Sequence, residues 1–236
     1  MIHVWTLWKK ELRTYFVSPI AYVFSAVYLF VAGLFFYLGV TLTGEASLRV
    51  LLGNLAITQI FVLPMLTMRH FAEERRQGTL EMLLTSPVPL WSVVIGKWLA
   101  SLSLCVMILA GTLIFPAVLA YYGDPDWGVM MTSYLGLFCV SGAFCAAGLF
   151  SSSLIDDQMA AGLIGAVILV PFWLVGRAEA LVPDEWADTI RPLSVLVHLD
   201  SFNRGVLDSV DLYYFAGFTG IFLFLTWQSL ESRRWR

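Results

Sequence analysis

Long uncharged stretches recur along this chain of 236 residues, separated by short segments that carry most of the charge. A helix rises about 1.5 Å per residue, so each stretch is long enough to cross a bilayer. The pattern therefore predicts six membrane-spanning helices, over Ile20–Thr41, Val50–Met68, Leu90–Tyr121, Val129–Ser152, Gln158–Val175 and Leu212–Leu230. Pro116 lies near the far end of the long third stretch, which predicts that part of this helix tilts or extends past the membrane.

An amphipathic pattern precedes the first predicted span, over residues 1–18. Basic residues lie off a stripe of apolar residues spaced three or four apart, which is formed by Ile2, Trp5, Trp8, Leu12 and Phe16. This pattern is typical of a helix lying in the membrane interface, with its basic residues, Lys9, Lys10 and Arg13, facing anionic lipid. A plain helical extension of the first span is the open alternative. Ser18-Pro19 favours a bend between the two helices.

Composition agrees with a membrane protein and excludes several other classes. The chain is 59% hydrophobic and 13% charged, whereas about a quarter of a soluble domain is charged. We therefore expect an all-α, polytopic membrane protein that forms a single domain over residues 1–236. The net charge of −3 provides no basic field for nucleic acid. Three scattered histidines predict no metal site, and we expect buried, unpaired thiols at Cys105, Cys139 and Cys145.

The distribution of Lys and Arg predicts the orientation of the spans. If both termini lie in the cytoplasm, ten basic residues fall on the inside and four on the outside. The inside residues are Lys9, Lys10, Arg13, Arg69, Arg75, Arg76, Lys97, Arg233, Arg234 and Arg236, and the outside residues are Arg49, Arg177, Arg191 and Arg204. The positive-inside rule therefore predicts cytoplasmic termini.

The loop over residues 69–89 combines dense charge with a short helical pattern. Thr79 is placed to cap a helix after Gly78, and Glu81 lies in its first turn, where a carboxylate is favourable. One apolar face follows, formed by Leu80, Leu83 and Leu84, before proline ends the helix. Such a helix suits docking to a soluble partner, and an ordinary solvated loop is the open alternative.

The same loop resembles the cytoplasmic loop of ABC-2-type transporter permeases. The pattern E-x-R-x-G-T-x-E-x-L-L-x-x-P, followed by a G-K pair at Gly96-Lys97, carries the resemblance. It implies a coupling helix that docks on an ATP-binding subunit through Glu74, Arg76, Gly78, Thr79, Leu80, Glu81, Leu83, Leu84 and Pro87.

The segment over residues 176–211 is predicted to form short helices outside the cytoplasm. One helix is expected to begin at Pro183–Trp186 and another after Pro192, with Ser209 or Asp211 capping the last span. The segment resembles the branch of ABC-2 permeases involved in gliding motility and nitrous-oxide-reductase maturation. His198, Phe202, Arg204, Gly205 and Asp208 carry this likeness, and the first three are the expected contacts for an extracytoplasmic accessory protein.

Polar and small residues inside the spans have two readings each. Asn54, Thr58 and Gln59 in the second span either line a translocation path or join helices across a subunit boundary by hydrogen bonds. In the fifth span, Gly162 and Gly165 belong to small-residue ladders that permit close helix packing, within one subunit or at a dimer interface. Asp156 and Asp157 are expected to form a solvated turn, a helix start or a second contact with the partner.

Together these features imply a membrane permease, which we expect to be an exporter or a mechanotransmitting complex. The resemblance implies two copies of an ATP-binding subunit, a second permease copy or paralogue, contact with membrane lipid, and location in a bacterial cytoplasmic (inner) membrane. No Walker loop or catalytic set occurs, so we expect no cofactor and no enzyme activity in this chain, with ATP and Mg²⁺ in the partner. The alternative is a stand-alone secondary transporter or a membrane enzyme. The lack of acidic, His or Arg residues at mid-depth in the spans counts against it.

Overall fold

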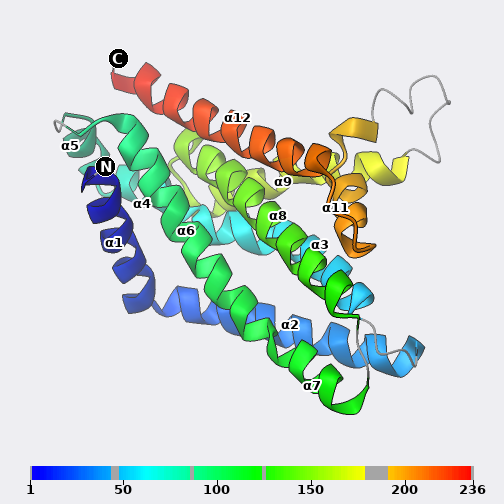
Figure 1. Ribbon diagram of the computed structural model, residues 1–236. Helices are drawn as coiled ribbons and strands as arrows, with labels where there is room; N and C mark the ends of the chain where they lie inside the picture. Colours follow the sequence, from blue (N-terminus) through cyan, green and yellow to red (C-terminus); the bar gives the residue numbers. More distant parts are fainter. Residues whose placement is uncertain (1, 44–47, 86–87, 124–125, 179–190, 235–236) are drawn as a thin grey trace.

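The computed structural model describes residues 2–43, 48–85, 88–123, 126–178 and 191–234, and every regular element in these ranges is helical (Figure 1). The elements are α1 Ile2–Val17, α2 Pro19–Thr43, α3 Arg49–Thr67, α4 Arg69–Arg76, α5 Thr79–Thr85, α6 Leu90–Thr112, α7 Ile114–Tyr122, α8 Trp127–Leu154, α9 Gln158–Ala178, η2 Arg191–Leu193, α11 Val195–Asn203 and α12 Ser209–Arg234. Six of the described helical segments are long and apolar enough to span a membrane. The predicted fold class is therefore confirmed. The helix start expected at Pro183–Trp186 lies outside the described residues.

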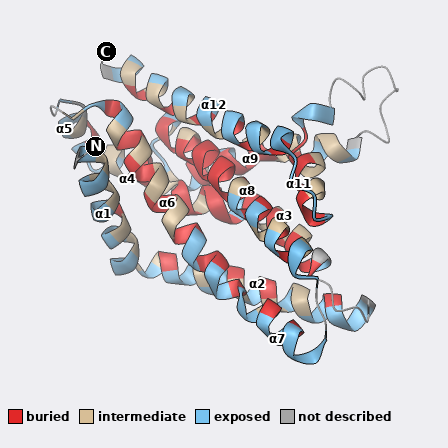
Figure 2. Cartoon of the chain, viewed as in Figure 1, coloured by how far each residue is buried: buried red, intermediate tan, exposed pale blue. Residues whose placement is uncertain are grey.

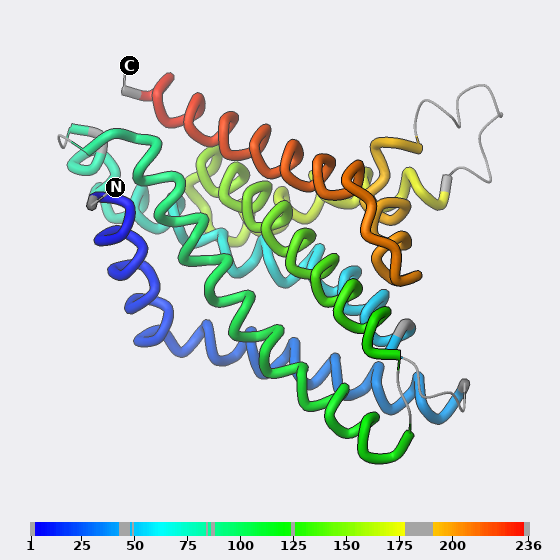
Figure 3. The backbone as a smooth tube through the Cα atoms, in the orientation of Figure 1, coloured from blue at the N-terminus to red at the C-terminus, as the bar shows by residue number. Residues whose placement is uncertain are grey.

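Two ends of the bundle matter for function. The start of α1, the end of α12 and helix α5 lie together at one end, which we call the terminal end (Figures 1 and 3). The opposite end, which we call the distal end, carries η2 and α11. The chain thus gathers its N-terminal helix and its short α4–α5 segment around the same group of helix ends.

Helix α8 forms the centre of the bundle, packed by α3, α6, α9, α11 and α12 (Figure 2). Small residues make this possible, because the stretch from Gly142 to Gly148 is buried and lets neighbouring backbones approach closely. At Gly148 a Cβ atom would lie 2.1 Å from Thr67 Oγ1, so the contact between α3 and α8 tolerates no larger residue. Helix α2, by contrast, is the least buried of the six spans.

The third span breaks between α6 and α7 at Leu113. Pro116 has no N–H to donate to the carbonyl of Thr112 one turn earlier, so the regular helical hydrogen bond is lost. The hydroxyl of Tyr134 in α8 donates to that carbonyl at 3.1 Å. The third span is thus interrupted one turn before Pro116, and a neighbouring helix satisfies the freed acceptor.

Helix α1 packs against α6, and only part of the expected apolar stripe faces that helix. Trp8 of the stripe is half-buried and donates to Ser103 Oγ of α6 at 2.9 Å. Trp5 and Phe16 of that stripe are 55% and 41% exposed, whereas Glu11 is buried and Tyr15 is half-buried. Gly96 permits the close approach, because a Cβ atom there would lie 3.0 Å from Leu7 Cβ. The chain bends at Ser18 as predicted, so α1 is a packed helix rather than an extension of α2.

At the distal end, the predicted cap of the last span is corrected. Asp208 Oδ1 accepts a hydrogen bond from the backbone N–H of Val210 at 3.0 Å, so Asp208 caps α12 in place of Ser209 or Asp211. A short helix does follow Pro192 as predicted, and Ser194 caps α11 by accepting from the N–H of Val197.

Candidate functional site

Helix α5 has one face turned into the bundle and one turned outward. Leu80 is 5% exposed and packs in a cluster with Phe71, Val94 and Leu230, while Leu83 is half-buried against the same cluster. The opposite face presents Glu81, Met82 and Thr85, and Met82 is 75% exposed. The apolar face that the sequence suggested for docking is thus occupied by the chain itself where it is described. The side chains of Leu84 and Pro87 lie outside the described residues.

The turn from α4 to α5 depends on Gly78, whose φ of 70° lies in the left-handed region that residues with a side chain rarely adopt. Thr79 does not act as the predicted cap. Its hydroxyl donates to the backbone carbonyl of Glu74 at 3.1 Å, which ties the first residue of α5 back to α4. Arg76 and Thr79 are exposed at this turn. The two short helices therefore form one hydrogen-bonded unit.

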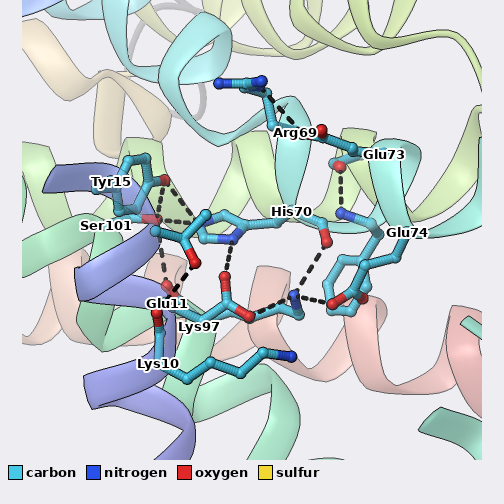
Figure 4. Close-up of polar contacts among 12 residues, drawn as sticks. Lys10, Glu11, Tyr15, Arg69, His70, Glu73, Glu74, Lys97 and Ser101 are labelled. Carbon is cyan, nitrogen blue, oxygen red and sulfur yellow. Dashed lines mark hydrogen bonds and ion pairs between the residues drawn. The ribbon is translucent and has the colours of Figure 1, made fainter. Parts of the chain in front are cut away.

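A buried lysine joins this unit to the spans. Lys97 of α6 is 2% exposed, and its Nζ lies 3.0 Å from Glu11 Oε1 of α1 and 2.7 Å from Glu74 Oε1 of α4 (Figure 4). It also donates to the backbone carbonyl of His70 at 3.0 Å. A buried ammonium is tolerated only with such compensation, because removing it from water costs several kcal/mol. Glu74, expected to contact a partner, is therefore committed largely to an internal ion pair.

His70 extends the network toward α1 and α6. Its Nε2 lies 2.8 Å from the Tyr15 hydroxyl and 2.6 Å from Ser101 Oγ, while its Nδ1 lies 3.6 Å from Glu11 Oε2 (Figure 4). The tautomer with its proton on Nδ1 fits these contacts, because Nε2 then accepts from a hydroxyl and Nδ1 faces a carboxylate. We call Glu11, Tyr15, His70, Glu74, Lys97 and Ser101 the Lys97 network.

The charge of Glu11 is stabilised by this setting. Burial alone raises the pKa of a carboxyl group, but the facing His70 ring and the Lys97 ammonium outweigh it and hold the pKa of Glu11 well below its usual range. Sequence reasoning missed Glu11, His70, Tyr15 and Ser101. The available signal was that Glu11 is the single acidic residue of α1 and lies one turn from Leu7 and Tyr15, on the face that packs against α6.

A pocket of about 580 Å³ opens beside the network between α1, α4 and α5. Glu74 and Lys97 line it on the inside, and Thr79 and Met82 line it next to the outward face of α5. The buried charges are therefore reached from the surface that the short helix presents.

Helix α4 is also fixed to the turn between α8 and α9. Arg75 forms an ion pair with Asp156 and donates to the backbone carbonyl of Ser153 at 2.5 Å. Ser152 Oγ accepts from the N–H groups of Phe71 and Ala72, at 3.0 and 3.2 Å. Of the two adjacent carboxylates, Asp157 accepts from the N–H of Ala160 at the start of α9. The helix-start reading is thus confirmed for Asp157, and Asp156 binds α4.

The polar residues of α3 separate into two groups. Gln59 is 1% exposed and donates to the Tyr28 hydroxyl of α2 at 3.2 Å, so it joins two helices of the same chain. Asn54 and Thr58 are half-buried and donate to carbonyls of their own helix, those of Val50 and Asn54. A role of Asn54 and Thr58 in a path or a subunit contact stays a prediction.

The two glycines of α9 show the first of their two predicted roles, close packing within one subunit, and a place at a translocation path or a dimer interface stays a prediction. A Cβ atom at Gly162 would lie 3.1 Å from Met68 Sδ, and one at Gly165 would lie 2.7 Å from Pro64 Cβ. Both glycines are buried against the α3 side of the same chain, so their small size serves packing within one subunit.

The three residues at the distal end that were expected to contact an accessory protein differ in their exposure. Phe202 is fully buried, and a Cβ atom at Gly136 of α8 would lie 2.8 Å from its Cβ. His198 is 8% exposed, with Nδ1 2.5 Å from Asp211 Oδ1 and Nε2 3.0 Å from the carbonyl of Pro192. Both side chains hold α11 in place and are not available to a partner in this conformation. Arg204 is exposed beside Asp200 and stays a predicted contact.

Comparisons with known proteins give one family. The family model described as ABC-2 family transporter protein matches residues 5–227, which covers α1 through most of α12. A search of curated proteins gave no match.

Proposed function

The chain belongs to the ABC-2 transporter family as a multi-pass membrane permease component, and we propose that it couples ATP hydrolysis by a separate subunit to movement of its spans. In this proposal the terminal end faces the cytoplasm, as the excess of basic residues favours. The complex is an exporter or a mechanotransmitting machine of a bacterial inner membrane. The likeness of the distal segment supports the gliding-motility and nitrous-oxide-reductase-maturation branch.

The observation that carries the proposal is the two-sided packing of α5. Its inner face is anchored by Leu80, so the helix has a fixed position on the bundle. Its outer face presents a carboxylate, Glu81, next to the exposed apolar side chain of Met82. A rigid, short helix with this outer face suits insertion into a groove of an ATP-binding subunit, because little conformational entropy is lost on docking.

The Lys97 network then provides the path by which docking acts on the spans. A displacement of α5 pulls on α4 through the hydrogen bond between Thr79 and the Glu74 carbonyl. Glu74 is paired with Lys97, about two turns into α6, and Lys97 is paired with Glu11 of α1. Buried ion pairs resist separation, so these helices move with α5 rather than independently of it.

The assembly that follows contains two copies of the ATP-binding subunit and a second permease copy or paralogue. ATP and Mg²⁺ bind in the partner. Asn54 and Thr58 of α3 remain the candidates for the path or the subunit interface, and exposed Arg204 remains the candidate for an extracytoplasmic accessory protein.

The proposal is tested by isolating the tagged chain in mild detergent from its native membrane and assaying the ATPase activity that accompanies it. Glu81→Arg reverses a charge on the outer face of α5 without touching the Lys97 network. Glu231→Arg is the matched control, since it makes the same reversal in the last turns of α12, at the same end of the bundle.

We expect ATPase activity with wild type and with Glu231→Arg, and its loss with Glu81→Arg. If no ATPase accompanies wild type, a stand-alone transporter is the better description. Undiminished activity with Glu81→Arg would leave the family assignment standing and remove α5 as the docking element.

A further inference from the structure

A groove at the bend between α1 and α2 gathers positive charge from two separate parts of the chain. Its volume is about 700 Å³, and it is lined by Lys9, Lys10, Arg13, Thr14, Val17, Ser18 and Arg69. Four of these seven described residues are basic and none is acidic. Three come from α1, while Arg69 is the first residue of α4. The fold therefore adds a cation that the amphipathic pattern of α1 alone does not provide.

Arg69 is held in position at the edge of this groove. Its Nη1 donates to Ser18 Oγ at 2.8 Å. Its Nε lies 3.2 Å from Glu73 Oε2 (Figure 4). Glu73 offsets one of the four positive charges, so the groove keeps a net positive charge. A guanidinium fixed by two contacts loses little further rotamer freedom when it binds an oxyanion, and its planar donors match phosphate.

The position of the groove makes it accessible to a phospholipid headgroup. The groove lies where the amphipathic helix α1 meets the first span, and an amphipathic helix next to a span is expected at the bilayer surface. Val17 is 76% exposed within the lining and Phe16, next to it, is 41% exposed. Cations and exposed apolar side chains at one bend suit a ligand that has a phosphate at one end and an acyl chain at the other.

We propose that this groove binds the phosphate of an anionic phospholipid, with Arg13 and Arg69 as its principal cations. The bound headgroup bridges α1 and α4, so it stabilises the arrangement in which Glu11 reaches the Lys97 network. The site is independent of the ATP-binding partner, and its test needs no ATPase.

The test measures lipid binding to the purified chain in mild detergent by native mass spectrometry. Phosphatidylglycerol is compared with zwitterionic phosphatidylcholine, for wild type, Arg13→Gln, Arg69→Gln and Arg76→Gln. Arg76 is the matched control, an exposed arginine of α4 that does not line the groove. Arg13→Gln is the cleaner variant, because Arg13 is exposed on α1, whereas Arg69→Gln also removes the contact to Ser18.

We expect phosphatidylglycerol to bind more tightly than phosphatidylcholine, and each groove variant to weaken it about fivefold. Arg76→Gln should leave it unchanged. Equal weakening by all three variants would overturn the site in favour of diffuse surface charge, as would equal binding of the two lipids. A competition arm uses soluble glycerol phosphate. If glycerol phosphate displaces the lipid at equal concentration, the groove is a phosphate site, and the proposal that a phospholipid is its ligand is overturned.

Discussion

The two ends of the bundle are built on different physical principles. At the terminal end, short helices are joined to the spans by buried charges, with Lys97 between Glu11 and Glu74 and a pocket opening beside them. At the distal end, α11 is held mainly by shape, with Phe202 packed on Gly136, and by one compact pair, His198 with Asp211. Shape complementarity fixes a single arrangement, whereas an ion network passes a displacement between helices. The difference agrees with the proposal that docking of a partner acts on the terminal end.

The largest effect is expected from removing the ammonium at the centre of the terminal end. Lys97→Met keeps the length of the side chain but leaves buried Glu11 and half-buried Glu74 without their counter-charge, which should lower the free energy of unfolding by about 3–5 kcal/mol. The measurement is denaturant unfolding in mild detergent. Lys10→Met, at an exposed lysine lining the same pocket, should change it by less than about 0.5 kcal/mol.

The double variant Glu11→Gln/Lys97→Met sharpens this prediction. It removes one of the stranded carboxylates, so it should be more stable than Lys97→Met alone. If the double variant is less stable by the sum of the two single effects, the residues do not act as a network.

At the distal end, Phe202→Ala should lower the free energy of unfolding by about 3 kcal/mol, because it leaves a cavity against Gly136. The co-purified ATPase activity of the folded fraction should remain, since the proposed docking helix lies at the other end of the bundle. Phe30→Ala, at a side chain of α2 that is 73% exposed, is the control. Loss of ATPase association in folded Phe202→Ala would show that the two ends are not separable.

A smaller effect is expected at the second contact of the distal end. Asp211→Asn removes the charge facing His198 Nδ1 and should cost about 2 kcal/mol, as for a buried hydrogen bond to a charged group. Asp200→Asn, in an exposed pair with Arg204, should cost less than about 1 kcal/mol. Equal losses in the two variants, measured by the same unfolding assay, would mean that the buried pair adds nothing beyond surface charge.

The smallest effect is a pH dependence from Glu11. Its pKa is lowered in the folded chain, so below about pH 4.5 the unfolded chain binds a proton that the folded chain does not. The stability from this group is therefore complete above pH 4.5 and is lost as the pH falls, by up to about 1.4 kcal/mol per pH unit. Glu11→Gln lacks this contribution, so the stability gap between wild type and variant should narrow below pH 4.5. A gap that is constant with pH would contradict the ionised Glu11.

The spans could be predicted from sequence because apolar length alone determines them, and each predicted span overlaps an observed helix. Which face of each helix is buried and which is exposed could not be predicted in the same way. The sequence indicated a docking face formed by Leu80, Leu83 and Leu84, yet Leu80 is buried inside the chain and Met82 on the opposite face is exposed. An apolar helix face does not show whether it packs within the chain or against a partner. Gly162 and Gly165 likewise pack within the chain. Sequence could not predict this, because a small residue does not show which helix will pack against it.

The Lys97 network was beyond sequence reasoning for another reason. Its members come from α1, α4 and α6, and Lys97 lies 86 residues from Glu11 in sequence. A spacing pattern detects neighbours on one helix, whereas these contacts depend on how three helices pack. The motif did mark Glu74 and Lys97, yet it gave no sign that they bind each other.

The central claim, that the outer face of α5 meets an ATP-binding subunit, is tested most directly by site-specific cross-linking. Met82→Cys places a thiol on the outer face and Leu80→Cys places one on the inner face, two residues away on the same helix. The native cysteines, Cys105, Cys139 and Cys145, lie within the spans and are buried or half-buried, so a water-soluble maleimide cross-linker should spare them. We predict a cross-linked product with the ATP-binding subunit from Met82→Cys and none from Leu80→Cys. A product from Leu80→Cys alone, or from neither in a complex that retains its ATPase, would contradict the account.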